Sequence, residues 1–292
     1  MSNLKRIFRR IKTAQNISKI TRAMEMVAAS KMRRAQDRAL SSRPYTDRLY
    51  QILASLEGRV DPQLHPLLQD KSQGKTMVIL LTTDKGLCGP HNTNLFRSLE
   101  TWITTKPNLD FNFVAVGKKG AFYVVKTNRQ LIADFPAFPD RFAYEDTLTI
   151  AQMVLDGFLK GDTKEVWLGY MRFINILSHQ PHFTKLLPIT QLFDQPQTPP
   201  LSPEATGEYL FEPSTQDILN WLLPYYVELQ IYQAVLNALA SEHSARMVAM
   251  KSAHDNATDI ISDLTLDYNR ARQGKITSEL LDIITARTAL GE

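Results

Sequence analysis

The sequence predicts an α/β fold in which long helices at the two ends of the chain form a coiled coil and an α/β domain is inserted between them. Two helical patterns, one at each end, predict the coiled coil, and short apolar runs that alternate with helical segments predict the inserted domain. Such an organisation is more typical of a mechanical component than of an enzyme that acts on a small molecule.

The C-terminal helix is predicted by a heptad pattern that continues without a break over seven heptads. A sustained period of about 3.5 residues keeps one seam of a helix facing a partner, which specifies a coiled coil. His243 and His254 lie on this seam, where a polar residue more often fixes the register than binds a metal. The seam positions are Leu222, Tyr226, Leu229, Gln233, Leu236, Ala240, His243, Met247, Met250, His254, Ala257, Ile261, Leu264, Tyr268 and Ala271.

The partner helix is expected from about Asn3 to Leu56, interrupted or bent near Pro44 and stopped by Gly58. This helix is the shorter of the two, so the C-terminal end of the long helix should project alone and need another chain to cover its apolar residues. The apolar residues at helical spacing in the first helix are Ile7, Ile11, Ala14, Ile17, Ile20, Met24, Val27 and Ala28.

The formal net charge of +4 hides an asymmetry along the chain. Residues 1–48 carry 13 basic against 3 acidic side chains, a net +10, whereas residues 225–292 carry 6 basic against 9 acidic, a net −3. Helices of opposite charge attract one another, which favours pairing of the two ends over self-association. A basic helix is also compatible with a solvated face, with phosphate contact or with an acidic protein partner.

The middle of the chain is predicted to form a mainly parallel sheet. Strands are expected at 76–82, 111–116, 165–173 and 186–193, with helices at 91–105, 118–126 and 146–159. Ser214 is a candidate N-cap for the last helix, which Pro224 should kink or restart. The expected division is a helix at 1–58, an α/β domain at 75–193, a Pro-rich linker at 194–213 and a second helix at 214–292.

The sequence offers no constellation that predicts catalysis, a metal or a cofactor. The loop Thr83–Asn94 follows the first strand, but its glycines match neither phosphate-binding pattern, so a structural turn is favoured over a nucleotide site. Six histidines are scattered, and the lone Cys88 has no base at a motif spacing. No apolar run approaches the length of a membrane span.

Three segments resemble the signatures of one family, the gamma subunit of F-type ATP synthase. The first is ITRAMEMVAASKMRRA at 20–35, and the second is DKGLCG at 84–89, followed by Asn92 and Asn94. The third comprises SEHSARMVAMKSA at 241–253, LTLDYNRARQ at 264–273 and ITSEL at 276–280. The matches occur in order and extend over most of the chain.

This resemblance implies an antiparallel coiled coil with a Rossmann-like α/β domain, and it implies a rotating central stalk that is itself non-catalytic and has no cofactor. The implied partners are the alpha and beta subunits of the alpha3-beta3 ring, the epsilon subunit and the membrane c-ring. The absence of a transit peptide favours a bacterial protein, peripheral at the cytoplasmic face of the cell membrane.

The resemblance also implies which residues contact the stator or couple rotation to catalysis. Met24 matches a shaft methionine that faces the lever region of beta, and the basic residues after it match an acidic lever loop of beta. The implied contact residues are Met24, Lys31, Arg33, Arg34, Glu242, Arg246, Arg272, Gln273, Thr277, Glu279 and Asp282.

The alternative is a basic coiled coil that binds nucleic acid. It rests on the charge of the first helix alone. Nucleic-acid binders of this kind interleave basic residues with aromatic residues that stack on bases, whereas residues 1–44 contain only Phe8 as an aromatic residue.

Overall fold

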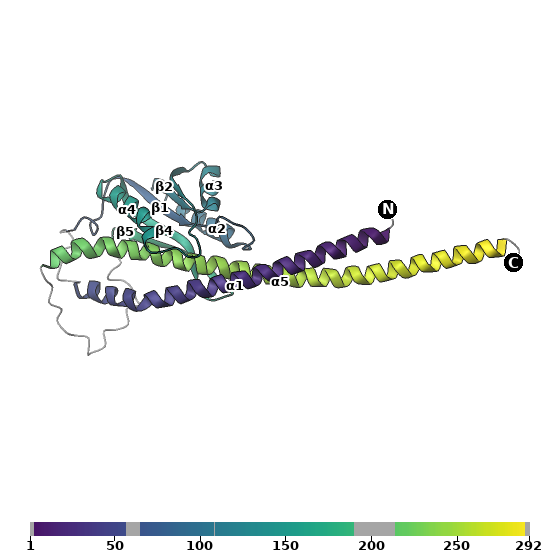
Figure 1. Cartoon of the computed structure of the whole chain (residues 1–292). Helices are drawn as coiled ribbons and strands as arrows, with labels where there is room; N and C mark the ends of the chain where they lie inside the picture. The colour runs from purple at the N-terminus through teal and green to yellow at the C-terminus, as the bar shows by residue number, and fades with distance from the viewer. Residues whose placement is uncertain (1–2, 57–64, 108, 190–213, 290–292) are drawn as a thin grey trace. The chain divides into compact units, whose positions relative to one another are not determined.

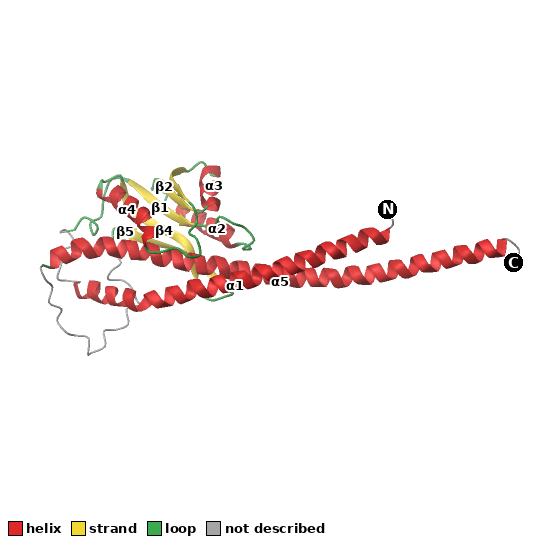
Figure 2. Cartoon of the chain, viewed as in Figure 1, coloured by secondary structure: helices red, strands yellow, loops and turns green. Residues whose placement is uncertain are grey.

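The computed structural model describes residues 3–56, 65–107, 109–189 and 214–289 of the chain (Figures 1 and 2). Its elements are α1 (Asn3–Leu56), β1 (Lys75–Leu81), α2 (His91–Thr104), β2 (Phe111–Val116), α3 (Lys118–Lys126), β3 (Gln130–Phe135), α4 (Glu145–Leu159), β4 (Thr163–Phe173), β5 (His179–Leu187) and α5 (Thr215–Ala289). The predicted linker at 194–213 lies outside the described residues.

The chain divides into two compact units, and each long helix contributes to both. We call Ser30–Ala245 the α/β unit, and Met1–Ala29 together with Arg246–Glu292 the terminal helix pair. The division falls within α1 and α5 because the first part of α5 packs on the sheet, whereas its last part packs on the beginning of α1.

The α/β unit contains a five-stranded sheet with the strand order β3-β2-β1-β4-β5. β1 pairs in parallel with β2 and β4, and β2 pairs in parallel with β3. β5 pairs antiparallel with β4 at the other edge. The mainly parallel sheet predicted from the alternation of strands and helices is therefore confirmed.

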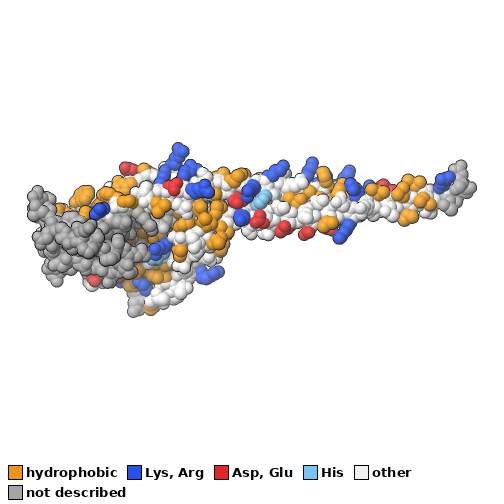
Figure 3. Space-filling model, turned by 90° about the horizontal axis from the view of Figure 1, so that it is seen from below, with side chains coloured by type: hydrophobic (Ala, Val, Ile, Leu, Met, Phe, Trp, Pro, Cys, Tyr) orange, Lys and Arg blue, Asp and Glu red, His pale blue; other side chains and the backbone are white. Residues whose placement is uncertain are grey.

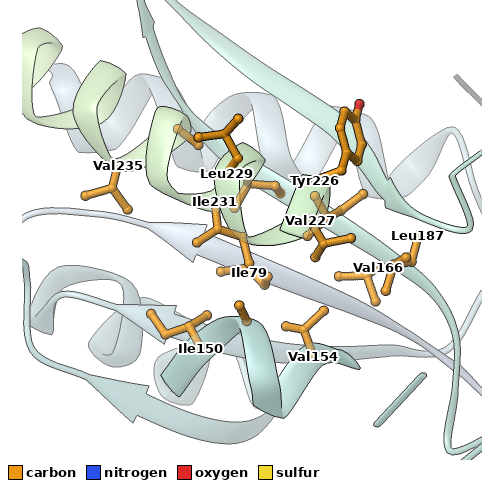
Figure 4. Close-up of a cluster of buried hydrophobic side chains, with 14 of the residues drawn as sticks. Ile79, Ile150, Val154, Val166, Leu187, Tyr226, Val227, Leu229, Ile231 and Val235 are labelled. Carbon is orange, nitrogen blue, oxygen red and sulfur yellow. The ribbon is translucent and has the colours of Figure 1, made fainter. Parts of the chain in front are cut away.

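Both faces of the sheet are covered by helices, which explains why β1 is a continuous apolar run. Met77 and Ile79 of β1 belong to one buried cluster, which α4 and α5 complete. Val78 and Leu80 belong to a second cluster on the other face, with side chains from α2 and α3. Figure 4 shows side chains of α4 and α5 gathered around Ile79.

The two edge strands differ from the prediction. β3 was missed because its residues alternate between exposed and half-buried, so it contains no continuous apolar run. The fourth strand was expected at 186–193, but β5 spans His179–Leu187, and residues from 190 to 213 lie outside the described part of the chain. Pro181 is compatible with β5 because an edge strand leaves some backbone groups without ladder partners.

The two long helices run through their prolines. α1 continues through Pro44, where an interruption or bend was expected, and α5 begins at Thr215 and continues through Pro224. The N-cap was predicted correctly, because Ser214 Oγ accepts a hydrogen bond of 3.1 Å from the Asp217 backbone N–H. Within the α/β unit, Gln233 of α5 donates to Ser42 Oγ of α1 at 2.7 Å.

The heptad seam of α5 is confirmed, since all 15 predicted positions are buried or half-buried. In the terminal helix pair the two helices lie side by side, and the contacts of Ser18 with His254 and of Phe8 with Tyr268 define antiparallel pairing (Figure 1). His254 Nδ1 lies 3.0 Å from the Ser18 carbonyl oxygen, which can only accept, so the imidazole donates. This polar seam position is paired, as a residue that fixes register should be.

The seam of α1 differs from the sequence-based expectation. Ile17, Ile20 and Val27 are 47%, 59% and 54% exposed, whereas Ser18 is half-buried and Thr21 is buried. A coiled-coil seam follows position in the heptad, and small side chains there let the helices approach closely. The Thr21 hydroxyl donates to the Ile17 carbonyl at 2.9 Å, so it is satisfied within its own helix. The larger apolar side chains are left on the surface.

The C-terminal end of α5 lacks an α1 partner, as predicted. Tyr268 already contacts Phe8, close to the beginning of α1 at Asn3. Every residue from 272 to 287 is exposed. The apolar residues on this end are Ile276, Leu280, Leu281, Ile283 and Ile284, which are 49–65% exposed.

Candidate functional site

A doubly wound sheet with this strand order binds a nucleotide at the carboxyl ends of its strands, where β1 and β4 meet, with the phosphates at the helix N-terminus after β1. The neighbouring helix N-terminus, that of α3, is bound by a side chain of the loop after β1. Asp84 Oδ1 accepts hydrogen bonds from the backbone N–H of Lys118 at 2.9 Å and of Ala137 at 3.3 Å. Lys118 is the first residue of α3, so the Asp84 carboxylate satisfies a backbone N–H at the positive end of that helix.

The loop that follows β1 is also held by its own side chains. Asn92 Nδ2 donates to Thr83 Oγ1 at 2.8 Å, and Thr83 Oγ1 donates to the Lys85 carbonyl at 2.8 Å. The cavity beside this loop has a volume of about 20 Å³, and Thr83, His91 and Glu242 are among its lining residues. A ligand pocket usually measures about 300 Å³ or more. The geometry therefore fits the structural turn predicted for this loop.

The described residues contain no group of three or more His, Cys, Asp or Glu side chains that could hold a metal ion. Cys88 is a free thiol and is 3% exposed. In the described part of the chain, no helix has a stretch long and apolar enough to cross a membrane.

Four of the predicted contact residues lie in the α/β unit. Arg33 and Arg34 are exposed on α1, and Arg34 Nη2 donates to Ser30 Oγ at 3.2 Å, which orders its guanidinium along the helix. Glu242 is half-buried on α5 and lines the small cavity. Lys31 differs from its two basic neighbours, because it forms an ion pair with Asp140 inside the chain.

The Asp140 carboxylate bridges the two long helices. Its Oδ2 lies 2.7 Å from Lys31 Nζ of α1, and its Oδ1 lies 3.0 Å from His243 Nε2 of α5. Burial of Asp140 opposes its ionisation, but the hydrogen bond and the charge of Lys31, together with the contact to His243, lower the pKa of this carboxyl below its ordinary value. Sequence reasoning missed Asp140, because it lies in a loop more than a hundred residues from either partner.

The remaining predicted residues lie in the terminal helix pair. Met24 and Arg246 are half-buried on α1 and α5. Thr277 donates to the Gln273 carbonyl at 3.0 Å, and Glu279 pairs with Lys275 at 3.3 Å, so both are satisfied along the helix. The exposed residues on the end of α5 are Arg272, Gln273, Thr277, Glu279 and Asp282.

A groove between α1 and α5 in the terminal helix pair was not predicted. It has a volume of about 940 Å³. Ala14, Ile17, Ala253, Ala257, Ile260 and Leu264 supply apolar side chains, and Arg6, Arg9 and Arg10 supply the basic ones. Figure 3 shows the same mixture more widely, with blue Lys and Arg side chains spaced along the helices and orange hydrophobic side chains between them. Such a surface suits a protein partner that is both apolar and acidic.

An α/β unit whose loop after β1 is held by its own side chains beside a cavity of only about 20 Å³, and a helix pair with an exposed apolar end, define a helical subunit of a larger assembly. The sequence matches the ATP synthase family over residues 3–290. It is 41% identical over 294 residues to the ATP synthase gamma chain of one Dehalococcoides mccartyi strain, covering 99% of this chain and 100% of that one. The gamma chain of Roseiflexus castenholzii is 43% identical over 296 residues, with complete coverage of both chains. The chain belongs to the ATP synthase gamma chain family.

Solved structures agree with this assignment. The fold is similar to a chain in the central stalk and c-ring structure of Tetrahymena thermophila mitochondrial ATP synthase, with a TM-score of 0.60 and 25% identity over 80% of this chain and 99% of that one. A chain of the Euglena gracilis mitochondrial ATP synthase shares the fold, with a TM-score of 0.70 and 22% identity over 98% and 94% of the two chains. These findings do not support the nucleic-acid-binding alternative. A gamma chain is a non-catalytic subunit of its complex.

The small cavity beside the loop after β1 leads to a direct prediction about nucleotides. The isolated chain is expected neither to bind ATP with micromolar affinity nor to hydrolyse it, because this loop lacks a phosphate-binding pattern and the cavity of about 20 Å³ is far smaller than a ligand pocket. Calorimetric titration of ATP into the monodisperse chain checks this, and a tight stoichiometric site would contradict it.

Proposed function

We propose that this chain is the central rotor of an F-type ATP synthase, turned by ion flow through a membrane c-ring. Rotation of its asymmetric surface drives the catalytic sites of the surrounding alpha and beta subunits through successive states. The chain supplies contacts that differ between those states, and the beta subunits supply the chemistry. It acts with an epsilon subunit, as a peripheral protein at the cytoplasmic face of the cell membrane.

The observation that carries this proposal is the uncovered end of α5. Apolar side chains such as Ile276, Leu280 and Leu281 are about half exposed on a single helix, which is unfavourable in water without a covering chain. A ring of alpha and beta subunits around this end would cover them. Family membership over residues 3–290 supports the same conclusion.

We propose that the predicted contact residues form four groups with different tasks. Met24 and Arg246, half-buried in the terminal helix pair, support its shape. Arg33 and Arg34, exposed on α1, present positive charge to the acidic lever loop of beta. The exposed group from Arg272 to Asp282 makes polar contacts with beta around the end of α5. Lys31 and Glu242 act from within the α/β unit.

A reversible cross-link tests the rotor function. Met26 is 58% exposed on α1, so Met26→Cys together with a cysteine in the lever loop of beta should form a disulfide on oxidation. We expect ATP hydrolysis by the assembled complex to stop when the disulfide forms and to recover on reduction. The matched control is the complex that carries the beta cysteine alone. It should not cross-link, because Cys88 of this chain is buried. Undiminished turnover in the cross-linked complex would show that rotation of this chain is not required.

A further inference from the structure

A loop of the α/β unit is fastened to both long helices close to the two points where the chain leaves that unit. The chain passes between the units at Ala29/Ser30 and at Ala245/Arg246. Lys31 and His243 lie within two residues of these points, and both contact Asp140. Torque carried along the covalent chain from one unit to the other passes through α1 and α5. It does so next to the residues that Asp140 holds.

The loop is held by its backbone as well as by the Asp140 side chain. Arg38 Nη1 of α1 donates to the Asp140 carbonyl at 3.2 Å and to the Phe142 carbonyl at 3.3 Å. Phe142 is 4% exposed, and its ring lies 5.4 Å from the ring of Tyr232 on α5. The loop is thus tied to α1 by two cations and to α5 by an imidazole and an aromatic contact.

A second loop is tied to α5 at the next residue. Ser244 Oγ donates to the Ile176 carbonyl, in the turn between β4 and β5, at 2.9 Å. His243 therefore contacts the loop that contains Asp140, and Ser244 contacts the turn that contains Ile176. Both residues lie in the last turn of α5 within the α/β unit. The apolar packing of α5 on the sheet is non-directional, whereas these polar contacts have defined geometry, so they resist sliding or twisting of the helices against the sheet.

From this arrangement we infer that Asp140 is a positioning residue for rotary coupling, one that locks α1 and α5 to the α/β unit so that torque passes between the units without slip. The inference rests on the proposed rotor function. The role does not require Asp140 to touch any other subunit. Its carboxylate, 37% exposed, acts by fixing the half-buried Lys31 and the buried His243 relative to the loop through charged hydrogen bonds of defined geometry.

Asp140→Ala in the assembled, membrane-reconstituted complex tests the inference. Amide hydrogen exchange in the 136–143 segment should be about tenfold faster, because two hydrogen bonds to a charged group are lost. Ion uptake per ATP hydrolysed, measured for protons and for sodium, should fall by about half while hydrolysis continues, because slip replaces productive rotation. Asp140→Glu, which keeps the charge, should restore most of the ion uptake. Asp156→Ala is the matched control, since its carboxylate pairs with Lys160 on the exposed surface of α4.

The possible outcomes distinguish a failure of the proposed rotor function from a failure of the inference about Asp140. If the unmodified complex does not transport ions on addition of ATP, the proposed rotor function fails. If it does, and Asp140→Ala transports as many ions per ATP as the Asp156→Ala control, the inference about Asp140 is overturned even if exchange in the loop has become faster. Asp140→Asn keeps the side-chain shape without the charge and is measured in the same way, so a failure of Asp140→Ala to assemble does not remove the test.

Discussion

Gly117→Ala is expected to destroy most of the stability of the α/β unit. Gly117 joins β2 to α3 with φ of 97°, a conformation that side chains other than glycine rarely adopt. An added Cβ would lie 2.3 Å from the Thr82 carbonyl oxygen and 2.8 Å from its carbonyl carbon. Backbone strain and overlap together should lower the free energy of unfolding by about 4 kcal/mol or more.

The neighbours of Gly117 cannot move away to relieve this overlap. The Thr82 backbone N–H donates to the Val116 carbonyl at 2.8 Å, and Thr82 Oγ1 accepts from the Gly120 N–H at 2.8 Å. Shifting Thr82 would break both bonds at the buried end of β1. Urea unfolding of the purified chain measures the effect. Gly86→Ala is the control, because its added Cβ meets nothing within 4 Å, and it should change stability by less than about 0.5 kcal/mol. Similar midpoints for the two variants would contradict this account.

The sequence predicted those parts of the fold that repeat or that are buried on all sides. The coiled-coil helix α5 could be predicted because its apolar pattern repeats over seven heptads. Single polar positions such as His254 therefore did not obscure the pattern. β1 and β2 were readable because both faces of the sheet are covered. β3 and β5 were harder because an edge strand needs no apolar run: every second residue of β3 is exposed, and most residues of β5 are only half-buried.

The first helix shows why apolar residues alone can misplace a seam. Ile17 and Ile20 have the spacing of a helix face, but the position that contacts α5 between them is Ser18. The misassignment has a functional reason, since an exposed isoleucine on a helix of this kind is available to other chains. We therefore expect Ile17 and Ile20 to face other subunits in an assembled complex.

The predicted contact residues likewise divide into those that are exposed and one that pairs within the chain. Arg33 and Arg34 have no acidic partner within 4.0 Å among the described residues, so their charges are available to another subunit, as the resemblance implied. Lys31 belongs to the same basic run but pairs with Asp140, and no spacing rule connects residues that far apart in the sequence. The local sequence pattern therefore predicted a basic surface on α1. Only the tertiary fold shows that Lys31 pairs within the chain while Arg33 and Arg34 are exposed.

Replacing Arg33 and Arg34 together by Glu is expected to uncouple the complex with little effect on its assembly. Exposed charges contribute little to folding, so the subunit should remain intact. The contact with an acidic lever loop of beta would become repulsive. Charges near a protein surface interact with about 1–4 kcal/mol at contact, so reversal of two of them should lower ATP-driven ion uptake by roughly tenfold or more. Lys31 is left unchanged, because Glu at that position would face Asp140 and disturb the α/β unit itself.

Lys118 and Lys119 provide the matched control, since they are also adjacent, basic and exposed, at the beginning of α3. Their replacement by Glu makes the same change in net charge at two exposed positions of the α/β unit. If uptake depends on the charge of the α1 surface, the Arg33 and Arg34 variant loses coupling while the lysine variant keeps it. Raising the salt concentration should narrow this difference, because exposed charges are screened within about 10 Å at 0.1 M salt. Equal uptake in the two variants would mean that the arginines are ordinary solvated side chains, and that the stator recognises the rotor by its apolar residues instead.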